Sequence, residues 1–156
     1  MKTIETTRLQ PGDIVSFHFP RREGNAPYPR PCLVMEATED EVVLAYGTTS
    51  QEKANRGCEI RLHTEFADCG LQRATRFVLA RRLRVAKNDP RLALPAQDGN
   101  PVIGQLTTGL HGRLRDLQNL ISASWPNSAE RLEAERQGIH PQRPSRRGRG
   151  TGVNRL

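Results

Sequence analysis

Three polar side chains stand beside the apolar stretches of the chain and could do chemistry on a phosphate group. His18 comes near the end of the first stretch, Arg30 opens the second and Thr49 follows the third. A guanidinium is always protonated and matches phosphate oxygens with two parallel N–H groups. Imidazole titrates near neutral pH, so His18 is a candidate general base. A threonine hydroxyl is too weak a base and would instead donate a hydrogen bond or orient a substrate hydroxyl.

A second polar group, Arg21, Arg22 and Tyr28, lies in a predicted loop at residues 20–29 that is rich in Pro, Arg, Gly and Asn. Cationic side chains beside an aromatic ring suit single-stranded RNA, because charge follows the backbone and the ring stacks on a base. Ordinary explanations also exist. Long polar loops are often simply mobile, surface arginines need no role, and a Thr-Thr-Ser run after a strand usually forms a turn.

The net charge of +7 favours a polyanionic partner, above all nucleic acid. Much of the excess lies at the C-terminal end. Residues 137–156 contain no acid but five arginines: Arg143, Arg146, Arg147, Arg149 and Arg155. This tail is rich in Gly, Pro and Arg and cannot bury enough apolar surface to order itself, so it is predicted to be disordered.

The three cysteines, Cys32, Cys58 and Cys69, form no C-x-x-C pair. Buried reduced thiols are therefore favoured over a zinc site built from Cys58, His63 and Cys69, and we expect no metal or other cofactor. No apolar run approaches the ~18 residues that span a bilayer, and the N-terminus lacks the apolar segment of a secretory signal. The expectation is a cytoplasmic protein without a membrane partner.

Hydrophobic alternation and turn signals predict short strands, followed by helices. The strands are expected at residues 14–19, 32–35, 42–46, 59–62, 75–79, 83–85 and 102–106. An amphipathic helix should follow, capped by Thr107 or Thr108 and ended by Pro126. Its apolar positions recur every three or four residues: Leu106, Leu110, Leu114, Leu117, Leu120 and Ile121.

A second helix is predicted at residues 127–137, where Asn127 and Glu130 have capping-box spacing. It is charged nearly all round, so it should pack weakly or against a partner. The expected organisation is an N-terminal extension at 1–8, a barrel domain at 9–124, a charged helical extension at 125–137 and a disordered basic tail at 138–156. Short strands followed by an amphipathic helix indicate a mainly β (α+β) fold, a small barrel flanked by a helix.

Three segments, in order, resemble the PemK/MazF family of type II toxin–antitoxin systems. PGDIV at residues 11–15 is similar to the family's opening strand, RPCLV at 30–34 to its R-P-x-L-V segment, and AYGTTSQ at 45–51 to its strand ending in T-S or T-x-Q. The resemblance covers about residues 9–124. It implies an SH3-like β-barrel, usually a homodimer, that cleaves single-stranded RNA without a metal and is neutralised by an acidic antitoxin protein.

The resemblance also assigns roles to residues. Arg30 matches the family's catalytic arginine and Thr49 its catalytic threonine, while Ser50 and Gln51 become candidate RNA contacts beside the loop residues 21–28. The family's arginine and aspartate on a later strand cannot be placed in this sequence, and residues 77–85 contain no acid.

Two other functions stay open. A non-catalytic barrel could bind nucleic acid or a protein partner, because small barrels host many functions; the missing acid and the basic tail favour this alternative. A structural or regulatory protein could instead use the charged helix at 127–137 as a docking element.

Overall fold

A computed structural model describes residues 9–21, 24–25, 28–50, 58–92, 101–124 and 127–138 of the chain. The side chains of Arg21 and Asn25 lie outside the described part, as do the predicted N-terminal extension and nearly all of the basic tail. The elements in chain order are β1 (Asp13–Phe17), β2 (Pro20–Arg21), β3 (Gly24–Asn25), β4 (Arg30–Ala37), β5 (Glu41–Thr48), β6 (Glu59–Leu62), β7 (Thr75–Ala86), β8 (Val102–Gln105), the 3-10 helix η2 (Thr108–Leu110), α1 (His111–Ala123) and α2 (Ser128–Gln137).

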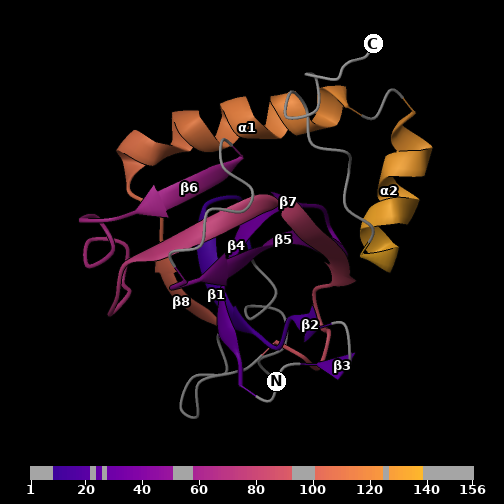
Figure 1. The fold of residues 1–156 in the computed structure, drawn as a ribbon. Coiled ribbons are helices and arrows are strands. Elements are labelled where there is room, and N and C mark those ends of the chain that lie inside the picture. Colours follow the sequence, from indigo (N-terminus) through magenta and orange to yellow (C-terminus); the bar gives the residue numbers. More distant parts are fainter. Residues whose placement is uncertain are drawn as a thin grey trace.

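One curled, six-stranded sheet dominates the molecule, with strand order β6-β7-β5-β4-β1-β8. Every neighbouring pair in it is antiparallel. In Figure 1, α1 crosses the top of the sheet beside β6, and α2 stands at the right near the end of β7. The mainly β expectation is therefore confirmed, and the predicted strand at residues 59–62 has the predicted bounds. The first strand is shorter than predicted, because β1 ends at Phe17.

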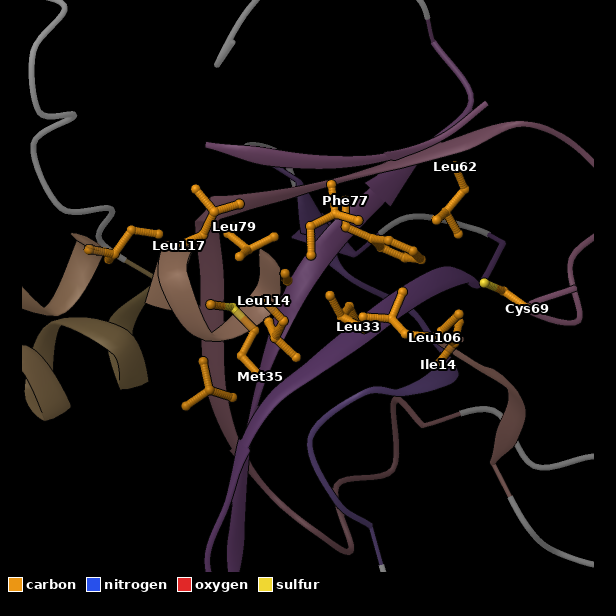
Figure 2. Packing of buried hydrophobic residues seen from close by; sticks show 14 residues of the cluster. Ile14, Leu33, Met35, Leu62, Cys69, Phe77, Leu79, Leu106, Leu114 and Leu117 are labelled. Atoms are coloured by element: carbon orange, nitrogen blue, oxygen red, sulfur yellow. The ribbon is translucent and has the colours of Figure 1, made fainter. Parts of the chain in front are cut away.

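Apolar side chains form two buried clusters on the two faces of the sheet. The alternation along each strand decides which cluster a residue joins, since successive side chains point to opposite faces. Ile14 joins the first cluster and Val15 the second, and the same holds for Leu33 and Val34. Figure 2 shows the first cluster, where α1 covers one face of the sheet.

The buried positions of α1 are Leu114, Leu117 and Ile121, which have the predicted spacing of three and four. Leu120 belongs to the predicted stripe, but 45% of it is exposed. At about 100° per residue it lies roughly 120° round the helix from Leu114, so it cannot reach the same core. The predicted cap is also wrong: Thr107 begins the 3-10 turn that precedes α1, and its side chain makes no capping bond.

β7 is one strand of 12 residues, although two separate strands were predicted at 75–79 and 83–85. Its pairing with β5 jumps between Tyr46, which faces Val78, and Ala45, which faces Arg82. Residues 79–81 thus form an insertion that has no partner on β5. Such a bulge bends a strand without ending it, which is why the polar stretch was misread as a break.

α2 begins as predicted, since the Asn127 side chain accepts hydrogen bonds from the backbone of Ala129 and Glu130. The helix does not stand apart, however. Glu135 is 2% exposed and makes ion pairs at 3.0 Å with Arg82 and at 2.9 Å with Arg84, both on β7. The charged helix therefore packs on the sheet through buried ion pairs. Neither of the helices in the described ranges is long and apolar enough to cross a membrane.

Candidate functional site

Arg30 stands at the start of β4, directly across from Phe17 of β1. Its Nη1 donates hydrogen bonds to the Tyr46 hydroxyl and the Gly47 carbonyl, both at 3.2 Å. Gly47 permits this close packing, because a Cβ there would overlap the carbonyl oxygen of Pro31. Among the described residues no partner occupies the Nε and Nη2 groups of this half-buried guanidinium. Arg30 is thus oriented and still has N–H groups to offer.

The end of β5 turns sharply beside Arg30. Thr48 is buried, and its Oγ1 accepts a hydrogen bond of 3.1 Å from the backbone N–H of Ser50. A hydroxyl bonded two residues onward is a typical turn device, so the ordinary explanation of the Thr-Thr-Ser run holds for Thr48. The turn leaves Thr49 and Ser50 exposed.

Arg76 and Glu59 anchor this turn from the neighbouring strands. The Nε of Arg76 donates to the Ser50 carbonyl at 2.8 Å, and its Nη1 lies 3.2 Å from Oε1 of Glu59. Both side chains are almost completely buried, at 7% and 3% exposed. The position of Thr49 therefore depends on a buried ion pair that sequence reasoning did not identify.

An acid does lie next to this part of β7, although it belongs to another strand. Residues 77–85 contain no carboxylate, but β6 places Glu59 directly across from Val78 of β7. The single signal in the sequence was an acid at the start of the strand predicted at residues 59–62, and without the register nothing linked it to Arg76.

Tyr46 is the aromatic centre of the surface around Arg30, and it contacts Arg81 and Phe19. The Cζ of Arg81 lies 3.8 Å from the centroid of the Tyr46 ring, and that of Arg30 lies 5.0 Å from it. The Phe19 ring meets Tyr46 edge-on, with centroids 5.4 Å apart. Cations held against aromatic rings are attracted by the negative ring face, so the rings position both guanidiniums.

The register places part of this surface on one face of the sheet, since directly opposed residues point the same way. One row across the strands holds Cys32, Tyr46, Val78 and Glu59, and the next holds Thr48, Arg76 and Arg61. We name the group formed by Arg30, Tyr46, Thr49, Arg76 and Arg81 the arginine face. Its three guanidiniums are opposed by one described carboxylate in contact, Glu59, so the face suits an anionic ligand.

Cys32 lies buried beneath this surface. Burial raises the pKa of its thiol to about 12, although a backbone hydrogen bond with Gly47 and the charges of Arg30 and Arg81 act in the opposite direction. All three cysteines are buried and free, as predicted, and no group of three or more His, Cys, Asp or Glu side chains in the described ranges is arranged to hold a metal ion.

The positions of the remaining predicted site residues neither support nor contradict their predicted roles. His18 is half-buried between two buried phenylalanines, and its backbone N–H donates to the Arg91 carbonyl. Tyr28 is 76% exposed two residues before Arg30. Arg21 forms part of β2, with its side chain outside the described part, and Arg22 and Gln51 lie wholly outside it. Of the predicted site, the structure links Arg30 by a hydrogen bond to Gly47, two residues before Thr49 and three before Ser50.

Arg81 and Tyr46 were also not identified from the sequence. A signal for Arg81 existed: in the run Arg81-Arg82-Leu83-Arg84, strict alternation puts Arg82 and Arg84 on one face and Arg81 on the other. Comparison of this sequence with protein-family models and with curated proteins finds no match.

Proposed function

We propose that this chain is a metal-independent endoribonuclease of the PemK/MazF type on an SH3-like barrel. The observation that supports it best is the meeting of two distant segments. Arg30 of the Arg-Pro segment donates to the Gly47 carbonyl of the segment that carries Thr49. An oriented guanidinium is thereby held two residues from Thr49, which is exposed, and would supply charge stabilisation for phosphodiester cleavage.

RNA supplies its own nucleophile in this reaction. The 2′-oxygen forms a bond to phosphorus as the bond to the 5′-oxygen breaks, which leaves a 2′,3′-cyclic phosphate. The 2′-OH proton passes to a general base, and the leaving 5′-oxygen takes up a proton. Arg30 would stabilise the charge that develops on the phosphorane oxygens, a role worth about 3 kcal/mol for one preorganised donor. Thr49 would donate a hydrogen bond to a phosphate oxygen or orient the 2′-OH.

The general base is the least defined part of the proposal. Glu59 is buried and bound to Arg76, so its carboxylate is a poor candidate. His18 stays a prediction, and a large loss of kcat in folded His18→Gln would support it. This shortage of a base is the observation that favours the alternative, a non-catalytic barrel that binds nucleic acid.

The decisive experiment incubates the purified protein with a long unstructured RNA in EDTA. We expect discrete fragments ending in cyclic phosphate, and a loss of rate of roughly 100-fold or more in Arg30→Ala. Arg115→Ala is the matched control, because Arg115 is an exposed arginine on α1. Intact RNA in the presence of folded wild-type protein would reject the ribonuclease and favour the binding barrel.

The resemblance adds two expectations about partners. The protein should form a homodimer and bind an acidic antitoxin protein that competes with RNA for the arginine face. Sedimentation of the purified chain tests the first expectation. Co-expression with the open reading frame adjacent to its gene tests the second, by rescue of growth.

A further inference from the structure

The bulge in β7 has a specific consequence for Arg81. Residues 79–81 have no partner on β5, and the backbone N–H of Leu79 donates instead to the Cys58 carbonyl at 2.9 Å. Bulges commonly re-aim a side chain at a functional surface. Here the insertion accompanies an Arg81 guanidinium whose Cζ lies 3.8 Å from the centroid of the Tyr46 ring and 5.5 Å from that of Phe19.

Arg81 differs from other arginines of its strand in what holds it. Arg76, Arg82 and Arg84 each contact a carboxylate within 3.2 Å. The contacts of Arg81 within the described part of the chain are the two aromatic rings, without an ion pair or hydrogen bond. A ring takes up one face of a guanidinium and leaves its N–H edges available, so the charge is positioned and not neutralised.

Arg30 is close enough to act with it. Because the two Cζ atoms lie 5.0 and 3.8 Å from the same ring centroid, they are at most about 9 Å apart. Both charges also reach the Cys32 thiol, whose pKa they act to lower. Two fixed guanidiniums at this separation can grip one phosphodiester from two directions, since each offers paired N–H donors.

We propose that Arg81 and Arg30, both held against the Tyr46 ring, form a two-arginine site for a backbone phosphate of a single-stranded polynucleotide. This inference rests on the proposed function only in taking nucleic acid as the substrate. It assigns Arg81 to binding of the ground state, and Arg81→Gln should therefore raise KM with little change in kcat.

The test measures binding of a fluorescent 2′-O-methyl oligonucleotide, which has no 2′-OH nucleophile and cannot be cut. Anisotropy titrations at several KCl concentrations give the slope of log affinity against log salt. Each neutralised phosphate of a single strand contributes about −0.7 to that slope. Arg81→Gln should make it shallower by about 0.7, which corresponds to a loss of affinity of about five-fold at 0.1 M relative to 1 M salt.

Matched variants separate the charge from the scaffold. Arg81→Lys should keep the slope, since it keeps the charge. Tyr46→Phe keeps the ring and should keep the Arg81 contribution, whereas Tyr46→Leu should lose it. Arg115→Ala, which removes an exposed charge on α1, should bind as the wild type does. Thermal melts should show Arg81→Gln to be folded, because Arg81 makes no ion pair with the residues that the structure describes.

The outcomes distinguish this inference from the ribonuclease proposal. RNA cleavage by the wild type, with an unchanged salt slope in folded Arg81→Gln, would overturn the two-arginine site and leave the ribonuclease standing. A shallower slope in Arg81→Gln without any RNA cleavage would support the site and overturn the ribonuclease. A wild type that binds no oligonucleotide would overturn both.

Discussion

Arg81 and Arg82 are neighbours on β7 and lie in opposite environments. Arg82 is completely buried and contacts the carboxylates of Glu135 and Glu36 at 3.0 and 3.8 Å and the Gln118 amide at 3.1 Å. Arg81 is half-buried and stacks on Tyr46. The first charge is cancelled within the fold and the second is kept for a ligand. In a basic chain, the number of arginines therefore indicates less than what each one contacts.

Four charged side chains form a largely buried ion-pair network between α2 and the sheet, called here the α2 network: Arg82, Arg84, Glu36 and Glu135. Opposing effects act on its charges. Desolvation lowers the pKa of Arg82, while the charges of Glu135 and Glu36 raise it. Its Nε and Nη1 find no partner in the described part of the chain. Buried charges of this kind stabilise a fold little as a whole, but removing one partner leaves another charge buried and uncompensated. The network therefore makes α2 sensitive to single substitutions.

The largest effect is expected for Glu135→Ala, which leaves Arg82 and Arg84 without their most buried carboxylate. We expect a loss of about 3–5 kcal/mol in the free energy of unfolding, measured by urea denaturation. Glu133→Ala, on the exposed side of the same helix, is the control and should change little. A loss below about 1 kcal/mol in Glu135→Ala would mean that α2 does not dock through this network.

Glu59→Ala tests Arg76, which combines features of Arg81 and Arg82. Arg76 lies on the arginine face, yet it is buried and paired with Glu59. Removing the carboxylate should cost about 2–3 kcal/mol and, by loosening the turn that carries Thr49, reduce kcat on the order of ten-fold.

Glu59→Gln is the conservative variant, because its amide oxygen can still accept from Arg76. Glu59→Gln should therefore have a kcat close to that of the wild type, and its free energy of unfolding should fall less than that of Glu59→Ala. Equal kcat for wild type and Glu59→Ala, with only stability reduced, would restrict the pair to a structural role.

Part of the fold could be predicted from the sequence. A continuous apolar run predicted β5, and a short strand was expected where β6 lies. The three-and-four spacing predicted the core stripe of α1, and the side chain of Asn127 caps α2 as expected. These features depend on neighbours within a few residues. The continuity of β7 was missed because its bulge depends on the pairing with β5, not on local pattern.

The site divides in the same way. Arg30 and Thr49 were named from short segments, but Glu59, Arg76 and Arg81 matter only through cross-strand register. Likewise the docking of α2 joins Arg84 to Glu135, 51 residues apart in the chain, and no periodicity reports such a pair. Because a helix charged all round looks solvated, its buried Glu135 could not be identified.

Arg81→Ala should have a small effect on stability despite its central place on the arginine face. Loss of a partly exposed cation–π contact costs about 0.5–1 kcal/mol, far less than the buried ion pairs of the adjacent Arg82. Urea denaturation beside Glu135→Ala measures the difference directly. A destabilisation of Arg81→Ala as large as that of Glu135→Ala would remove the distinction between a ligand-binding and a structural arginine.

The smallest effect is expected at the exposed rim of the α2 network. The hydrogen bond from Arg136 lowers the pKa of Glu41 from its ordinary 4.5, with the charges of Arg136 and Arg84 acting in the same direction. A carboxyl with a lowered folded pKa stabilises the native state above its unfolded pKa and loses that contribution as pH falls below about 4.5. Glu41→Gln should therefore unfold slightly more readily than the wild type at neutral pH, and the difference should vanish in acid.

Glu39→Gln, exposed in the same turn, is the control. Because exposed pairs contribute little, a large difference that persists at low pH would mean that Glu41 acts through packing and not through its charge.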